Sequence, residues 1–125
     1  MNFRPELAEK VMAGSKTVTR RLVSGNPRSP WFEGGCSLKV DHTYAVCPGR
    51  GKDAIGRARI VSVRQERVGL LSEDEARREG FETPSAFYDA WRSINGTYDP
   101  NSLVWRVELA VVPVEDLSLW EAAGV

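Results

Sequence analysis

The sequence is poor in soft metal ligands, with two cysteines and one histidine among 125 residues. Cys36 and Cys47 stand apart without a Cys-x-x-Cys spacing, and His42 is the only imidazole. A closed zinc site normally takes four Cys or His ligands, so we expect no metal, and no pattern in the sequence calls for a cofactor. We expect both cysteines to be free thiols, because a disulfide is the less favoured state in a reducing cytosol.

Long apolar runs are absent as well. No stretch approaches the roughly 20 apolar residues that cross a bilayer, and the first residues lack the apolar stretch of a signal peptide. We therefore expect a soluble, cytoplasmic protein without a membrane partner. No Pro/Gly/Ser-rich linker is long enough to divide the chain, which predicts a single domain over 1–125, with 113–125 as a C-terminal tail.

There is no excess of charge of either sign, but the charges are unevenly placed. Residues 1–69 hold 13 of the 17 Lys and Arg residues and only 6 of the 17 Asp and Glu residues. A basic half is what a surface that binds a polyanion such as RNA requires. Folding can interleave the two halves, so the asymmetry alone does not decide between RNA and a small ligand.

A short segment, Gly14–Arg21, concentrates the chemically useful side chains. It reads Gly-Ser-Lys-Thr-Val-Thr-Arg-Arg and follows a predicted helix. Lysine anchors a phosphate when it is charged, and acts as a general base when burial or neighbouring cations lower its pKa. Arg20 and Arg21 stand close enough in sequence to Lys16 to do so. The alternative is a strand with a solvated basic face, in which threonine is common.

Periodicity and capping signals predict an α+β domain. We expect helices over 5–13, 70–80 and 83–94, and strands over 17–22, 43–47, 55–68 and 103–111. The segment 24–39, rich in Gly, Pro and Ser, is a predicted long loop, and the basic Pro-Gly-Arg-Gly-Lys segment 48–52 a predicted turn. The strands should curl into a small, partly closed barrel with helices at its ends.

Simple alternation describes the expected faces of the strand over 55–68. It places Arg57, Arg59 and Val63 on one side and Ala58 and Ile60 on the other. Neither side is purely apolar, which suits a barrel strand that leaves the core partway along its length.

The helix over 70–80 carries a candidate proton donor. Ser72 and Glu75 are spaced as a capping box, and Gly80 ends the helix. Glu79 would then lie in the last turn, where the helix dipole and Glu75 would raise its pKa in the direction that a donor needs. The alternative is an exposed glutamate offset by the two arginines that precede it.

Aromatic and basic residues elsewhere supply candidate ligand contacts. Trp31, in the long loop, either stacks on a base or pins the loop to the core, and we favour pinning because tryptophan is usually largely buried. Phe87 and Trp91 should be core residues. We interpret the 48–52 segment as a hairpin turn in the first place, and as a nucleic-acid contact in the second. The residues expected to contact a substrate are Gly14, Ser15, Arg20, Arg21, Trp31, Tyr44 and Arg50.

The sequence resembles the ASCH domains, a family of the PUA-like superfamily. Their signature is G-x-K-x-x-[E or T]-x-R after a first helix, and Gly14, Lys16, Thr19 and Arg21 match it in order and spacing. The order of the predicted helices and strands matches the family as well. Threonine at position 19, in place of the more common glutamate, resembles the branch that hydrolyses N4-acetylcytidine.

That resemblance implies roles for three residues. Lys16 would be the proton acceptor, Thr19 the nucleophile and Glu79 the proton donor, with Glu75 or Glu82 as alternatives if the alignment slips. A neighbouring base is what a threonine hydroxyl needs to become nucleophilic. Arg20 or Arg21 would stabilise the oxyanion. The 24–39 loop and the 48–52 turn depart from the compact amidohydrolases and would reshape the mouth of the barrel.

Two classes of function follow. The first is an amidohydrolase acting on an N4-acylated cytidine or a related modified nucleoside. The second is a non-catalytic RNA-binding module, for which the fold and the basic half speak, or a ribonuclease of the ASCH family. The partner is a modified nucleoside in the first case and RNA in the second.

Overall fold

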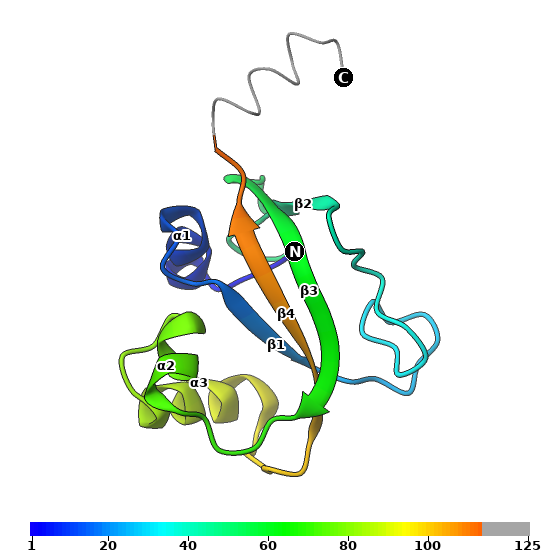
Figure 1. Ribbon diagram of the computed structural model, residues 1–125, viewed down its shortest axis with the longest axis vertical. Helices are drawn as coiled ribbons and strands as arrows, with labels where there is room; N and C mark the ends of the chain where they lie inside the picture. The colour runs from blue at the N-terminus through cyan, green and yellow to red at the C-terminus, as the bar shows by residue number, and fades with distance from the viewer. Residues whose placement is uncertain (114–125) are drawn as a thin grey trace, which may run out of the picture.

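Four antiparallel strands form one curved sheet in the order β1-β4-β3-β2 (Figure 1). The computed structural model describes residues 1–113, so the predicted C-terminal tail lies almost wholly outside the described residues. The elements are α1 (Pro5–Ala13), β1 (Val18–Leu22), β2 (Thr43–Val46), β3 (Gly56–Arg67), α2 (Glu73–Arg78), α3 (Pro84–Asn95) and β4 (Leu103–Val111). This half-barrel sheet with three helices, counted over residues 1–113, confirms the predicted fold class.

Each face of the sheet covers its own hydrophobic cluster. Val104 and Val107 are fully buried and, three residues apart on β4, point to opposite faces. Val107 packs with Phe3 and Val11 of the α1 region, whereas Val104 packs with residues of α3 and of the segment before α2. In Figure 1, α1 lies beside the upper part of the sheet, and α2 and α3 lie together below α1, beside the lower end of the sheet. Phe87 and Trp91 belong to the second cluster, as expected of core residues.

A register shift in β3 overturns the simple alternation predicted for that strand. The pairing with β4 moves by one residue between Ile60 and Ser62, as in a β-bulge. Val63 therefore packs against the same cluster as Ile60 instead of sharing the side of Arg57 and Arg59. An extra residue in a strand reverses every later side chain, and periodicity of two cannot reveal it.

The helix before the site is shorter than predicted. α2 begins at Glu73, not at residue 70, and Glu79 is its C-terminal cap instead of a residue of its last turn. Ser72 Oγ accepts a hydrogen bond from the Glu75 amide at 3.1 Å, which is one half of the predicted capping box. The other half is missing, because the Glu75 carboxylate bonds to arginines of the sheet.

The ends of three strands also differ slightly from prediction. β1 begins at Val18, since Thr17 donates its amide to Arg78 O at 2.8 Å instead of entering the strand. β2 ends at Val46, and Cys47 pairs with Asn2 in an isolated parallel bridge. β3 spans 56–67 instead of 55–68.

The long loop over 24–39 lies to one side of the sheet (Figure 1), and hydrogen bonds join it to β4. Trp31 is half-buried against the cluster beneath α1, and the indole nitrogen of Trp105 on β4 donates to the carbonyl oxygens of Trp31 and Phe32 at 3.0 and 3.2 Å. A bridge between Ser24 and Phe32 closes the loop on itself. The loop is therefore attached through two tryptophans, Trp31 in the loop itself and Trp105 on β4.

Two further properties of the described part of the chain bear on function. None of its helices combines the length and the apolar character needed to span a membrane. Within residues 1–113 no three His, Cys, Asp or Glu side chains are gathered so that they could hold a metal ion. Cys36 and Cys47 are free thiols.

Candidate functional site

Lys16 is a buried lysine with a full set of hydrogen bonds. Its position follows from Gly14, which ends α1 in the left-handed conformation, at φ 81°, and turns the chain toward α2. The residue is 3% exposed. Its Nζ donates to Val18 O at 2.8 Å, to Glu79 O at 2.7 Å and to Glu79 Oε1 at 2.8 Å. An ammonium group has three protons, so every donor is used.

Glu79 links Lys16 to a second buried cation. The residue is also 3% exposed, and its Oε2 accepts from Arg20 at 3.0 Å. Gly80 follows directly: its φ is +98°, and a Cβ there would crowd Lys10 Cδ at 3.3 Å and make an ordinary contact with Lys16 Cβ at 3.5 Å. Of the three glutamates that the sequence offered as donors, Glu79 is the one that contacts Lys16.

The pKa of Lys16 lies below the ordinary lysine value. Burial is the largest cause, because removal from water disfavours the charged amine. The charge and the hydrogen bond of Glu79 act in the opposite direction, and Arg21 and Arg20 lower the pKa further. Lys16 is therefore a lysine whose proton is easier to remove than that of a solvated one.

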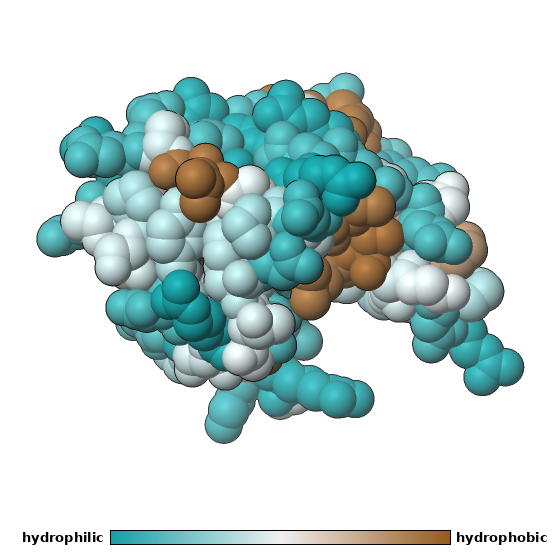
Figure 2. All heavy atoms as spheres, turned by 90° about the horizontal axis from the view of Figure 1, so that it is seen from below, coloured by the Kyte–Doolittle hydropathy of each residue, from teal (hydrophilic) through white to brown (hydrophobic). Residues whose placement is uncertain are grey.

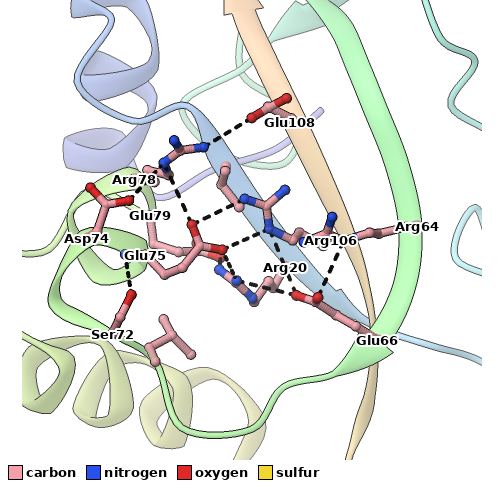
Figure 3. A network of polar contacts seen from close by, with 12 residues as sticks. Arg20, Arg64, Glu66, Ser72, Asp74, Glu75, Arg78, Glu79, Arg106 and Glu108 are labelled. Carbon is pink, nitrogen blue, oxygen red and sulfur yellow. Dashed lines mark hydrogen bonds and ion pairs between the residues drawn. The ribbon is translucent and has the colours of Figure 1, made fainter.

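A group of ion pairs behind this site ties α2 to the sheet (Figure 3). The Glu75 carboxylate accepts from Arg20 on β1 at 2.6 Å and from Arg106 on β4 at 2.9 and 3.2 Å. Arg20 and Arg106 are directly opposite in the β1–β4 register, which is why one carboxylate reaches both. Glu66 on β3 completes the group at 3.4 Å from Arg20 and 3.9 Å from Arg106.

This group also shifts two pKa values. Burial raises the pKa of Glu75, but the hydrogen bonds and charges of Arg106 and Arg20 outweigh burial and bring it to about 2. Burial lowers the pKa of Arg20, and Glu79 and Glu75 more than reverse that effect. One atom of the group is left over: within residues 1–113, Arg20 Nε is buried without a hydrogen-bond partner.

Thr19 is held by Arg21, two residues along the same strand. The Thr19 hydroxyl is buried, and Arg21 Nε donates to its Oγ1 at 3.3 Å. Arg21 itself is fixed by a 2.7 Å hydrogen bond to Asn2 O and by the rings of Phe3 and Trp31, which lie 5.1 and 5.3 Å from its guanidinium. A cationic donor on Oγ1 favours the negative charge that develops when the hydroxyl loses its proton.

A pocket of about 490 Å³ joins these groups. Its polar wall contains Lys16, Thr19, Arg20, Arg21 and Glu79, with Arg50 also lining it. Its apolar wall comes from the N-terminal segment and from the α2–α3 region and includes Phe3, Leu7, Phe81, Phe87, Trp91 and Ile94. Ile94 and Leu22, which both line it, are more than a third exposed. Figure 2 shows apolar side chains gathered between hydrophilic ones on the face seen from below.

Four of the predicted contact residues do not line the pocket. Gly14 caps α1, and the exposed Ser15 donates from its hydroxyl to Lys10 O at 3.3 Å. Trp31 packs beneath the loop and touches the site only through Arg21. The Tyr44 hydroxyl accepts from the Lys39 amide at 2.9 Å.

Sequence reasoning missed two charged residues of the site and one of its walls. Arg106 and Glu66 lie on separate strands, and only the pairing of those strands brings them to Arg20 and Glu75. Neither residue stood out in the sequence, because β4 also carries Glu108 and β3 carries several arginines. The wall supplied by α3 was also missed, because Phe87 and Trp91 are core residues that present part of their surface to the pocket.

Comparison with solved structures places this fold among the ASCH domains. No family model and no curated protein matches the sequence. An ASCH domain from Lactobacillus crispatus superposes with a TM-score of 0.65 at 20% identity, over 84% of this chain and 69% of its own. A mutant of the ASCH protein of Zymomonas mobilis gives 0.57 at 21% identity, over 98% and 78%. Protein EF3133 from Enterococcus faecalis gives 0.58 at 19%, over 85% and 69%.

Proposed function

Because the chain has the fold of the ASCH domains, we propose that it is an amidohydrolase that removes the acyl group from an N4-acylated cytidine. One observation carries the proposal: the buried Lys16–Glu79 pair and the Thr19 hydroxyl line the same pocket. A general base, a nucleophile and a general acid are what cleavage of an amide through an acyl-enzyme needs.

Burial lets the Lys16–Glu79 pair supply both the base and the acid. Transfer of one proton from Nζ to the carboxylate gives an amine and a carboxylic acid without a change in net charge. Low exposure favours the neutral form of such a pair, since neither charge is hydrated. The hydrogen bond from Arg20 to Glu79 Oε2 favours the ionic form, whereas the lowered pKa of Lys16 makes the proton on Nζ easier to remove.

The reaction then proceeds in two stages. The Lys16 amine takes the proton of Thr19 as Oγ1 bonds to the acyl carbon. Arg21, which donates to Oγ1, stabilises the negative charge that develops on that oxygen. The bond between the acyl carbon and N4 breaks, Glu79 gives its proton to N4, and cytidine leaves. Water then hydrolyses the Thr19 ester, which releases the carboxylic acid and restores the hydroxyl. In the first stage Lys16 must exchange one of its present hydrogen bonds for one to Thr19.

The test is release of cytidine from N4-acetylcytidine by the purified protein. Thr19→Val, which removes the hydroxyl at nearly constant volume, and Lys16→Met should each lower kcat by at least about 100-fold, the usual contribution of a positioned base. Thr19→Ser keeps the hydroxyl and should retain measurable turnover. Circular dichroism confirms that each variant is folded. Wild-type protein without turnover, or variants as active as wild type, would contradict the proposal.

A further inference from the structure

The charges that line the pocket are strongly unbalanced. Five cationic side chains face a single carboxylate: Arg4, Lys16, Arg20, Arg21 and Arg50 against Glu79. That carboxylate is already paired with Lys16 and Arg20. A pocket with walls of one sign concentrates ligands of the opposite sign. An uncharged nucleoside brings no charge to offset this excess, whereas a phosphorylated one does.

Two of the five cations are available to a ligand. Arg20 is held by carboxylates, and Arg21 is held by Thr19, Asn2 and two aromatic rings. Arg50 is exposed and, within residues 1–113, its side chain makes no hydrogen bond and no ion pair. Arg4 donates only to the uncharged Ser93 hydroxyl, at 3.0 Å.

The backbone turn over 48–52 brings Arg50 to the pocket. Gly49 and Gly51, on either side of it, have φ of +145° and +77°, conformations that other residues rarely adopt. The turn is joined to the N-terminal segment by hydrogen bonds from the Phe3 amide to Cys47 O and from the Cys47 amide to Met1 O, at 3.0 and 2.9 Å. The same pairing brings Arg4 and Arg50 to one pocket from opposite ends of the first fifty residues.

We propose that the ligand is a nucleotide, whose 5′-phosphate is bound by Arg50 with Arg4 beside it. On a cytidine ring the exocyclic nitrogen and the ribose lie at opposite ends. If N4 faces Thr19, as the proposed function requires, the ribose and its phosphate point away from the buried Thr19, and Arg50 is an exposed cation of the same pocket lining. Guanidinium groups suit this task because their planar N–H donors match phosphate oxygens in pairs.

The test measures binding, not turnover. Wild-type protein is titrated with cytidine and with cytidine 5′-monophosphate by calorimetry at low salt. The monophosphate should bind at least about tenfold more tightly, the effect of one charge-assisted hydrogen bond, and added salt should weaken that preference. Arg50→Ala should remove most of it. Lys52→Ala takes a cation from the same turn but not from the pocket lining, and should keep it.

Three outcomes would overturn the proposal. The first is no binding of the monophosphate, or equal affinity for the two ligands. The second is an equal loss in Arg50→Ala and Lys52→Ala, which would mean that only the general charge of the turn matters. The third is tight binding of a single-stranded RNA oligomer with no preference for the monophosphate over cytidine. A preference that depends on Arg50 in a protein without deacylase activity would support the phosphate site and contradict the proposed function.

Discussion

Lys16 and Glu79 are two ionisable residues that stability alone does not require to be buried. Removing charges from water is costly, and the pair is tolerated because Nζ uses all three of its donors and each carboxylate oxygen accepts a hydrogen bond. Two cations converge on the one carboxylate. The two members of the pair are therefore not equivalent, and their removal should have different consequences.

Glu79→Gln should destabilise the protein more than Lys16→Met. The glutamine variant leaves the Lys16 and Arg20 charges without the carboxylate between them and should lower the free energy of unfolding by about 3 kcal/mol. The methionine variant leaves Glu79 paired with Arg20. Urea unfolding at pH 7 measures both values. A larger loss of unfolding free energy in Lys16→Met than in Glu79→Gln would contradict the central position of the Glu79 carboxylate between the two cations.

The pH dependence of deacylation should report the Lys16–Glu79 pair. The active form holds one proton between the two residues, so activity falls at high pH, where the proton held by Lys16 is lost from the pair. Because the pKa of Lys16 is lowered, the alkaline fall in kcat/KM should come below the usual lysine value of about 10.4. A rate that still rises with pH at that point would contradict this assignment.

At the scale of the element, α2 depends on the sheet beneath it. A helix of six residues is too short to be stable alone. It is fixed by Glu75 to Arg20 and Arg106, and by Arg78 to Glu108 at 3.2 Å (Figure 3). Since α2 delivers Glu79, these ion pairs set the position of the proposed proton donor.

Glu75→Gln should weaken the protein at neutral pH but much less in acid. The folded-state pKa of Glu75 is depressed to about 2, so its contribution is fully present above its unfolded value of about 4.3 and is lost as pH falls toward 2. We expect a loss of about 2 kcal/mol at pH 7, discounted for partial exposure. Glu73→Gln, on the exposed side of α2, should change stability by less than about 0.5 kcal/mol. The measurement is the free energy of unfolding of both proteins from pH 7 to pH 2. A difference between wild type and Glu75→Gln that stays constant over this range would contradict the assignment.

The two glycines that end α1 and α2 allow a matched comparison. Gly14 and Gly80 both have positive φ, but a Cβ at Gly14 meets nothing within 4 Å, whereas one at Gly80 meets Lys10, Leu7 and Lys16 at 3.3–3.5 Å. Gly14→Ala should cost about 1 kcal/mol of stability for the left-handed conformation alone. Gly80→Ala should cost more, because its Cβ also crowds Lys10 Cδ at 3.3 Å, and it should reduce activity, because a shift at this position moves the adjacent Glu79. Equal effects on stability and activity would refute a spatial role for Gly80.

At the scale of the whole molecule, the sequence was informative where signals are local. Glycines and caps mark the ends of α1 and α3, and alternation marks β4, so the elements and the fold class were predicted. The β-bulge after Ile60 was not, because it depends on the partner strand. Nor could spacing bring Arg106 to Arg20, or show that the pocket combines residues from all three thirds of the chain. Only the register of the sheet and the packing of α3 determine these contacts.

The most direct measurement is to look for the acyl group on Thr19. The protein is mixed with N4-acetylcytidine, quenched in acid at short times and digested, and the peptide containing Thr19 is analysed by mass spectrometry. We predict an acetyl group on Thr19 that forms as cytidine is released, and none in Thr19→Val. Release of cytidine at an unchanged rate by Thr19→Val, with no acetyl group on the wild-type peptide, would contradict the role of Thr19 as nucleophile.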